Sequence, residues 1–347
     1  MSASLHSLEH LHSIATAFQH TTTATTFPTR SARSPTDFLR QHIVPSRVTH
    51  LPHTCHHWPA MGWGLPENER DATTPLVPSA SHAVLCGRPL LDGVTEPTVR
   101  LAWVPGGADA DAIIDGVFRE PAYEAVPLSV ALTAVRGNHD EEQRRRRGVA
   151  YLQTQNSNLT ESLGDLIDGG VVPASLPFFD EAFGDRPIAV NLWIGTQHST
   201  TVWHADCVDN VYAVLVGTKT FHLLPPTAAH LLNPTVVPAG AYCIDTACDA
   251  AEPGTRFHTH TTDSTVRWFN PTTTPDGAFT VTVSAGSALY LPAHWHHKVT
   301  QQPTQQSDVV IAVNYWYEIQ RNDPAFTLVK YIDELADKLA AERATTE

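Results

Sequence analysis

The second half of the chain is a series of short apolar runs, rich in β-branched and aromatic residues, that are separated by proline and glycine. This spacing is typical of antiparallel sandwiches and barrels, and not of alternating βα units. The sequence therefore predicts a mainly β domain from Gly148 onward. The runs that we expect to form strands are 149–153, 188–193, 211–216, 219–224, 279–283, 288–291 and 309–317.

Residues 235–278 differ from the other connections between these runs. The segment is longer, contains few apolar residues and shows no clear periodicity. We interpret it as a large irregular insertion between two barrel strands, a position that often carries substrate-contacting surface. The polar segment 136–147 is expected to be an exposed, mobile loop. Both segments are predicted to flank the binding pocket.

Helical patterns are found mainly on the flanks of the β region. Leucines and isoleucine at helical spacing predict a helix at 4–18, and apolar residues on one stripe predict an amphipathic helix at 324–344. A short helix is expected at 37–40 and another at 127–135. Residues 98–104 alternate as in a strand and end in a Pro-Gly-Gly turn.

These patterns divide the chain into four parts. Its 347 residues are 42% hydrophobic, which is enough for one large buried core. We predict an N-terminal helical or flexible segment (1–34), an α+β part (35–147), a barrel (148–322) and a C-terminal helix (323–347). That helix could pack on its own barrel or form a homodimer.

Bulk composition argues against several partners. The net charge is −14, and the one dense basic run, Arg144–Arg147, directly follows acidic residues, so nucleic-acid binding is not expected. No apolar run is long enough to span a membrane. The five cysteines are scattered, which indicates a reducing compartment. We expect the cytoplasm, with the nucleus as the alternative and organelle targeting by residues 1–34 as the less favoured one.

The 20 histidines include one frame that suits a metal site in a barrel. The frame His139-Asp140-Glu141 lies in a charged run with no apolar neighbours to exclude water, so we reject it. In contrast, His204-Ala205-Asp206 follows a strand-like run and precedes another. Residues i and i+2 of a strand project to the same face, so His204 and Asp206 are expected to point together into the barrel.

A third ligand is expected from residues 289–299, which contain His294, His296 and His297. Two histidines and one carboxylate form the facial set that leaves adjacent iron(II) positions open for a co-substrate and dioxygen. Spacing alone does not choose among the three histidines.

The motifs together resemble the jumonji-C hydroxylases, and most closely their small lysyl hydroxylase members. The shared pattern is His-x-Asp, Gly-x-Lys, Leu-Pro-x-x-Trp-x-His-x-Val and Val-Asn-x-Trp-Tyr. In this sequence these motifs occupy 204–206, 217–219, 291–299 and 313–317, and further similarities extend from about residue 35 to 335. The resemblance implies a double-stranded β-helix, the jelly-roll barrel of the cupins, and selects His297 as the third ligand.

The resemblance also implies the cofactors and their contacts. Iron(II) would be held by His204, Asp206 and His297, which would thus form the catalytic centre. The co-substrate 2-oxoglutarate would place its distal carboxylate on Lys219 with hydroxyl support. The residues implied to contact 2-oxoglutarate are Lys219, Thr201, Tyr151, Asn210 and Asn314. An anion in an apolar barrel requires such a buried cation.

The implied reaction is hydroxylation of a protein side chain, with lysine favoured, and release of succinate and carbon dioxide. The resemblance suggests a translation-associated GTP-binding protein as substrate. Demethylation of methyl-lysine on the same fold is the main alternative. A non-catalytic cupin-like metal-binding module, a zinc hydrolase and a peptidase are further alternatives; the intact set of His204, Asp206, His297 and Lys219 argues against the first, and no His-Glu-x-x-His helix supports the last.

Overall fold

The computed structural model describes most of the chain. The described residues are 25–26, 34–64, 80–87, 95–106, 109, 111–155, 157–245, 257–271, 273–319, 331 and 334. The helix predicted at 4–18 lies outside them. So does nearly all of the helix predicted at 324–344, of which Tyr331 and Glu334 are described and are helical.

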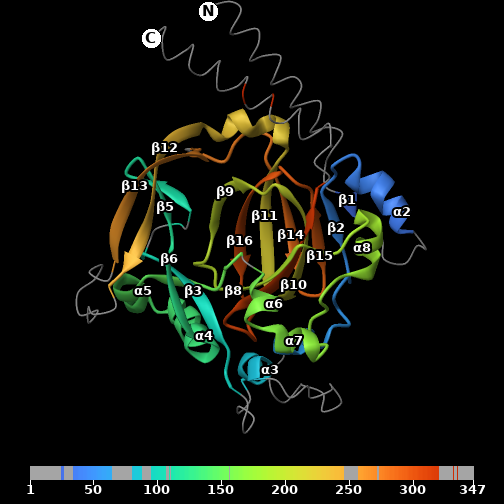
Figure 1. Cartoon of the computed structure of the whole chain (residues 1–347), viewed down its shortest axis with the longest axis horizontal. Coiled ribbons are helices and arrows are strands. Elements are labelled where there is room, and N and C mark those ends of the chain that lie inside the picture. Colours follow the sequence, from blue (N-terminus) through green and yellow to red (C-terminus); the bar gives the residue numbers. More distant parts are fainter. Residues whose placement is uncertain are drawn as a thin grey trace, which may run out of the picture.

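Two antiparallel sheets face each other and form the centre of the molecule (Figure 1). The larger sheet contains, in spatial order, β1 (Thr25–Thr26), β2 (Thr49–Leu51), β15 (Ala288–Leu291), β10 (Val208–Val216), β17 (Val310–Glu318) and β8 (Ala189–Gly195). The smaller sheet contains β14 (Phe279–Ser284), β11 (Thr218–Leu224), β16 (His296–Gln302) and β9 (Thr201–Ala205). Only the β1–β2 pair is parallel in these two sheets. This arrangement confirms the predicted mainly β, jelly-roll architecture.

Both faces of the larger sheet are buried. In β10, Tyr212 and Val214 pack between the two sheets, whereas Val211, Ala213 and Leu215 pack against helices on the outer face. A strand buried on both faces shows a continuous apolar run and not an alternation. This is why residues 211–216 are uniformly apolar in the sequence.

Short helices cover the outer face and the lower edge of the barrel (Figure 1). They are α2 (Pro35–Phe38), α3 (Ala80–Leu85), α4 (Leu128–Arg136), α6 (Asn158–Glu161), α7 (Gly164–Asp168) and α8 (Pro177–Phe183). The first follows Ser34, whose side chain and that of Asp37 form a capping box. The helices predicted at 37–40 and 127–135 are therefore found, with α2 beginning two residues earlier.

A third sheet precedes the barrel in the chain. It contains β6 (Ala122–Pro127), β3 (Thr98–Val104) and β7 (Val149–Tyr151), all antiparallel. The central strand β3 has the bounds predicted from its alternation. Tyr151, the last residue of β7, is buried against Trp193 and Tyr212 of the barrel.

The prediction of an irregular insertion at 235–278 is wrong. Residues Pro234–Ile244 (β12) and Phe257–Phe269 (β13) form a long antiparallel hairpin, which joins β5 (Val117–Glu120) and β4 (Ala112–Ile114) in a fourth sheet. Most of β13 is exposed on both faces. The usual alternation of apolar and polar residues is therefore missing, and the strand cannot be recognised by its period.

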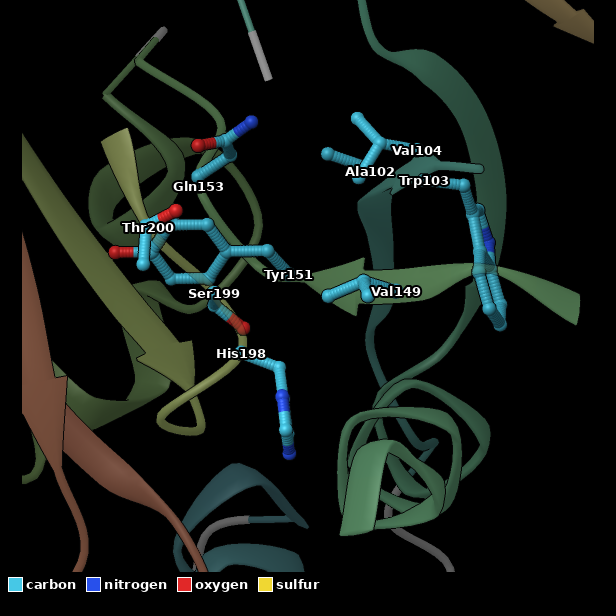
Figure 2. Close-up of a pocket in the computed structure, with 9 residues that line it drawn as sticks. All are labelled: Ala102, Trp103, Val104, Val149, Tyr151, Gln153, His198, Ser199 and Thr200. Atoms are coloured by element: carbon cyan, nitrogen blue, oxygen red, sulfur yellow. The ribbon is translucent and has the colours of Figure 1, made fainter. Parts of the chain in front are cut away.

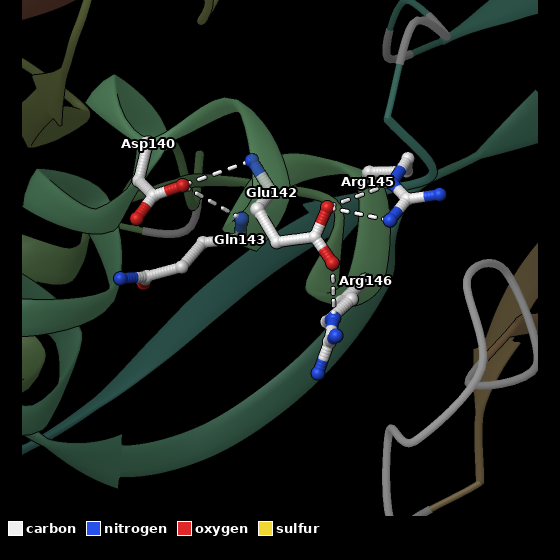
Figure 3. Close-up of polar contacts among 5 residues, drawn as sticks. All are labelled: Asp140, Glu142, Gln143, Arg145 and Arg146. Carbon is white, nitrogen blue, oxygen red and sulfur yellow. Dashed lines mark hydrogen bonds and ion pairs between the residues drawn. The ribbon is translucent and has the colours of Figure 1, made fainter.

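The prediction of a mobile loop at 136–147 is also wrong. A 3-10 turn at Gly137–His139 leads into helix α5 (Glu141–Arg147). Asp140 caps this helix by accepting bonds from the Glu142 and Gln143 amides, and Glu142 pairs with Arg145 and Arg146 (Figure 3). Acidic residues in the first turn and arginines in the last turn complement the helix dipole.

Among the described residues, no helix is long and apolar enough to cross a membrane.

Candidate active site

His204, Asp206 and His297 lie together at one end of the smaller sheet. The first two come from β9 and the residue that follows it, and His297 is the direct cross-strand partner of His204 on β16. One potential ligand atom from each residue lies within 4.8 Å of the others, and His297 Nε2 is 3.8 Å from Asp206 Oδ2. Two nitrogens and one oxygen on one side of a point can hold a divalent transition metal with further positions open.

Both histidines are oriented by the backbone. The Nδ1 atom of His204 is 2.8 Å from the Val202 carbonyl oxygen, and that of His297 is 3.0 Å from the Trp295 carbonyl oxygen. A carbonyl accepts only, so each Nδ1 carries the hydrogen and each Nε2 keeps its lone pair. Burial and the neighbouring His204 lower the pKa of His297 to about 4, which favours the neutral, metal-binding form. The donor set and its tautomers therefore fit a metal.

A β-bulge between β9 and β16 shapes this site. His204 pairs with His297 and Thr201 pairs with Val299, so three steps along β9 match two steps along β16. In a regular strand, residues three apart would point to opposite faces. Because of the extra residue, Thr201, His204 and Asp206 all line the same cavity.

The other histidines of this region are placed elsewhere. His296, adjacent to His297 on the strand, points away from the cavity and packs edge-on against Phe269. Burial lowers its pKa to about 3. His294 has a left-handed backbone (φ 66°), and its amide donates to the Asp206 carbonyl at 2.7 Å. This bond fastens the turn before β16 to the end of β9.

Lys219 lies deep in the same cavity with 1% of its surface exposed. Its ammonium donates to the Tyr151 hydroxyl at 3.0 Å and lies over the rings of Tyr151, Trp193 and Tyr212. None of the ion pairs among the described residues involves it. Burial lowers its pKa to about 7. A buried cation without a counter-charge is a binding site for an anion.

The remaining predicted contact residues also line the cavity. Thr201 Oγ1 accepts a bond from the Val299 amide at 3.0 Å, which leaves its hydrogen to donate. Asn314 donates to Asn210 at 3.2 Å and accepts from Trp193 Nε1 at 2.8 Å. These bonds show that Asn314 also has a structural task, because it joins three strands of the larger sheet.

Other residues of the cavity were missed or misjudged from the sequence. Trp193 and Trp316 were not singled out from the sequence, and both line the cavity. Further lining residues are Gln155, Tyr212, Phe221 and Val299. Their apolar and aromatic character is ordinary for a barrel core, so only the three-dimensional arrangement distinguishes them.

Tyr151 is shared between this cavity and a second one (Figure 2). Figure 2 shows its ring beside Gln153, Ser199 and Thr200, with Ala102, Val104 and Val149 across the gap. The Thr200 hydroxyl donates to Asp109 at 2.7 Å. Tyr151, the last residue of β7, therefore lines both cavities, the second together with the residues just before β9.

Asp111 adds an acidic group near the triad. It precedes β4 and has a left-handed backbone with φ 54°. Burial raises its pKa to about 6, while attraction to His204 acts in the opposite direction. No motif in the sequence pointed to this residue.

Comparison with known proteins agrees with this geometry. Residues 91–323 match the cupin-like domain family. The chain is 33% identical over 315 residues to "Lysine-specific demethylase JMJ32" of Arabidopsis thaliana, covering 84% of this chain and 81% of that protein. It is 30% identical over 315 residues to "Bifunctional peptidase and (3S)-lysyl hydroxylase JMJD7" of Homo sapiens, covering 87% and 86%.

A solved structure, "X-Ray structure of E. coli ycfD", matches with a TM-score of 0.37 and 10% identity over 84% of this chain and 54% of that one. The family match spans well over half of the chain, and the alignments cover 81% and 86% of the two relatives. The chain therefore belongs to the cupin-like domain family, within its jumonji-C branch of hydroxylases and demethylases.

Proposed function

We propose that this protein is an iron(II)- and 2-oxoglutarate-dependent oxygenase that hydroxylates a lysine side chain of another protein. The observation that supports this most directly is the sharing of one cavity by two features. The His204, Asp206 and His297 donors lie at one place on its wall, and the uncompensated Lys219 cation lies at another. 2-Oxoglutarate has a chelating 2-oxo acid end and a distal carboxylate, so it suits both the metal-binding donors and the Lys219 cation.

Iron(II) would be held by the Nε2 atoms of the two histidines and by the Asp206 carboxylate. When bound together, the metal and 2-oxoglutarate supply oxygen activation coupled to loss of carbon dioxide and formation of succinate. The backbone carbonyls that accept from Nδ1 of His204 and His297 keep the rings oriented before a metal arrives. Such outer contacts tune affinity by about 10- to 100-fold in metal sites.

The protein itself has to bind and orient 2-oxoglutarate and keep water out of the cavity. The Lys219 ammonium would pair with the distal carboxylate, and the Tyr151 and Thr201 hydroxyls would donate to it. Tyr212, Phe221 and Trp193 would cover it with apolar surface. Low polarity strengthens each charge-assisted bond to the carboxylate. Asn210 and Asn314 would border the chelating end.

Lysine is proposed as the target residue because both full-length relatives carry lysine in their names. The partner that we propose is a translation-associated GTP-binding protein, in the cytoplasm or nucleus. Among the described residues, the cysteines at positions 55, 86, 207 and 243 form no disulfide, which is compatible with those reducing compartments. Homodimerisation through residues 324–344 also stays a prediction.

The test is turnover of 2-oxoglutarate by purified protein with iron(II), with and without candidate lysine-containing proteins. We expect succinate formation that a true substrate stimulates, and a product heavier by one oxygen atom. His204→Ala should abolish both. His222→Ala is the matched control, because His222 is absent from the cavity lining and should leave turnover unchanged. A protein that binds iron but forms no succinate under any condition would exclude the proposal.

Demethylation of methyl-lysine is the second candidate, favoured by the Arabidopsis thaliana relative. The same hydroxylation would then fall on an N-methyl carbon, and the product would lose formaldehyde. Matched peptides with unmodified and methylated lysine separate the two reactions. Gain of one oxygen on unmodified lysine supports the hydroxylase, whereas loss of a methyl group with release of formaldehyde supports the demethylase.

A further inference from the structure

Asp209 is a buried acid on β10, behind the metal-binding cavity. The neighbouring strand residues Asn210 and Tyr212 line the cavity, so the side chain of Asp209 projects to the opposite face of the strand. Only 8% of Asp209 is exposed. From that face its carboxylate cannot reach an ion held in the cavity, and no step of the proposed function uses it.

The Asp209 carboxylate accepts two hydrogen bonds from parts of the chain that follow much later. Its Oδ1 atom accepts from the Tyr290 hydroxyl at 2.8 Å and from the Ala293 amide at 3.2 Å. The first donor is a fully buried side chain of β15. The second belongs to the turn of residues 292–295, which joins β15 to β16. The carboxylate therefore fastens this turn to β10.

The next amide of the same turn holds the backbone of Asp206. His294 donates its amide hydrogen to the Asp206 carbonyl oxygen at 2.7 Å. The β9–β16 ladder ends with the pair of Ala205 and His296, so Asp206 lies one residue beyond it and is held there by the bond from the turn. His294 has a left-handed backbone, with φ 66°. A residue other than glycine keeps this conformation only where the surrounding contacts impose it.

The end of the turn orients the ring of His297. The Trp295 carbonyl oxygen lies 3.0 Å from His297 Nδ1 and accepts its hydrogen. Trp295 is itself held on two sides, because its indole donates to the Ser46 carbonyl at 3.0 Å and its amide donates to the Pro292 carbonyl at 3.3 Å. One turn thus contacts two of the three proposed metal ligands.

We infer that Asp209 is a positioning residue for the metal site: by holding the turn 292–295 against β10, it keeps Asp206 and His297 in place for an ion. This rests on the proposed function, because it concerns the same donor set. Asp209 acts only through the turn and does not touch the ion. Its bond to Ala293 joins positions 84 residues apart, so the folded barrel is needed to form it.

The experiment measures the affinity of the full chain and its variants for manganese(II), used in place of iron, by calorimetry. Asp209→Leu keeps the approximate size of the side chain and removes its acceptor. We expect roughly 10-fold weaker binding, the lower end of the range for contacts outside the ligands themselves. Asp209→Asn keeps an oxygen that can accept both bonds, so it should bind manganese as the parent does.

Tyr317→Phe is the matched control. Tyr317 is the cross-strand partner of Asp209 on β17, is fully buried, and donates its hydroxyl hydrogen to the Asp180 carboxylate at 2.9 Å. The variant loses a comparable buried bond that has no link to the turn. Its free energy of unfolding should fall, and its affinity for manganese should stay at the parent value.

Tyr290→Phe removes one of the two donors to Asp209 and leaves the bond to the turn in place. We expect about 3-fold weaker manganese binding, within the range for one neutral hydrogen bond. In the Asp209→Leu background the same change should cause no further loss, because the hydroxyl acts through the carboxylate.

Cobalt(II) gives a second reading that does not depend on stability. Its visible absorption bands report how the ligands are arranged around the ion. At saturating cobalt, the bands of Asp209→Leu should differ from those of the parent, whereas the bands of Asp209→Asn and Tyr317→Phe should match them. A residue with a purely structural role would leave this spectrum unchanged.

The outcomes separate this inference from the proposed function. If the parent binds no manganese, the proposed function fails and the role of Asp209 fails with it. If the parent binds and His204→Ala abolishes binding, but Asp209→Leu keeps the parent affinity and cobalt spectrum, the role of Asp209 alone is overturned. Equal losses in Asp209→Leu and either Asp209→Asn or Tyr317→Phe overturn it too. If Asp209→Leu does not fold, parent-like affinity of Tyr290→Phe overturns the role.

Discussion

The rings of His204 and His297 face each other across one step of the β9–β16 ladder, with their centroids 4.1 Å apart. Their Nδ1 atoms both bond to the carbonyl two residues earlier in the chain, so the two Nε2 atoms are presented as a pair. Cross-strand pairing thus assembles two thirds of the donor set, and Asp206 supplies the rest. The geometry exists in the fold before any ion is added.

His297→Ala should therefore remove metal binding without unfolding the barrel. We expect affinity for manganese(II) to fall by about 100-fold or more, since loss of a ligand exceeds the effect of losing an outer contact. Calorimetric titration measures this directly. His222→Ala, on the adjacent strand β11, should retain the parent affinity; a similar loss in both variants would mean that the ion binds elsewhere.

Lys219→Met should stabilise the ligand-free protein and abolish co-substrate binding. The buried ammonium lacks a counter-charge, and its lowered pKa reports that burial disfavours the charged form. Methionine removes this penalty, so the free energy of unfolding at pH 6 should rise by roughly 1–4 kcal/mol. Urea unfolding gives the change, and calorimetry should show no 2-oxoglutarate binding. Lower stability of the variant would indicate that Lys219 has a compensating partner.

Binding of 2-oxoglutarate should weaken as the pH rises above 7. The pKa of Lys219 is about 7 in the free protein, so above that pH the amine is mostly neutral. A carboxylate ligand favours the ammonium form, and binding must then take up a proton. Affinity should consequently be constant below about pH 6 and fall with increasing pH above 7.

The lowered pKa of Lys219 also makes the free energy of unfolding depend on pH. Between about pH 7 and 10.5 the unfolded chain holds a proton on this lysine that the folded protein has lost. Stability contributed by this group therefore rises with pH across that interval. The rise should be missing in Lys219→Met, and an identical pH profile for both proteins would contradict the assignment.

Gly217→Ala should destabilise the β10–β11 connection. Gly217 has φ +78°, and a Cβ there would lie 2.8 Å from the Gln302 carbonyl oxygen and 2.9 Å from a Val310 methyl carbon. Left-handed strain and the close contacts together should lower the free energy of unfolding by about 1–3 kcal/mol. Gly62→Ala is the control, because no atom lies within 4 Å of its added carbon. Urea unfolding of the two variants should differ clearly.

Sequence patterns predicted the barrel well where strands are buried. The apolar runs at 211–216 and 288–291 lie within strands of the same sheet, and the alternation at 98–104 gives the bounds of β3. These signals are strong because burial selects apolar residues at every position or at alternate ones. The exposed hairpin of β12 and β13 has no such selection and was misread as irregular.

The candidate site divides in the same way. His204 and Asp206 could be paired from their i, i+2 spacing alone, because residues at that spacing in extended chain project to the same face. The third ligand could not be chosen by spacing, because its place opposite His204 depends on a cross-strand register that only the folded chain specifies. Asp111 and Tyr212 were missed because single acids and core aromatics carry no pattern.

The bulge in β9 has a consequence for how this strand can change over generations. Thr201 and His204 are three positions apart, so a straight strand could present only one of them to the cavity. Deletion of one residue between them would turn one of the two side chains away from the cavity, whereas a substitution between them would leave the spacing unchanged. The segment is therefore intolerant of altered length. The spacing Thr-x-x-His-x-Asp is accordingly a better fingerprint for recognising such a barrel in an unfamiliar sequence than the residues that lie between.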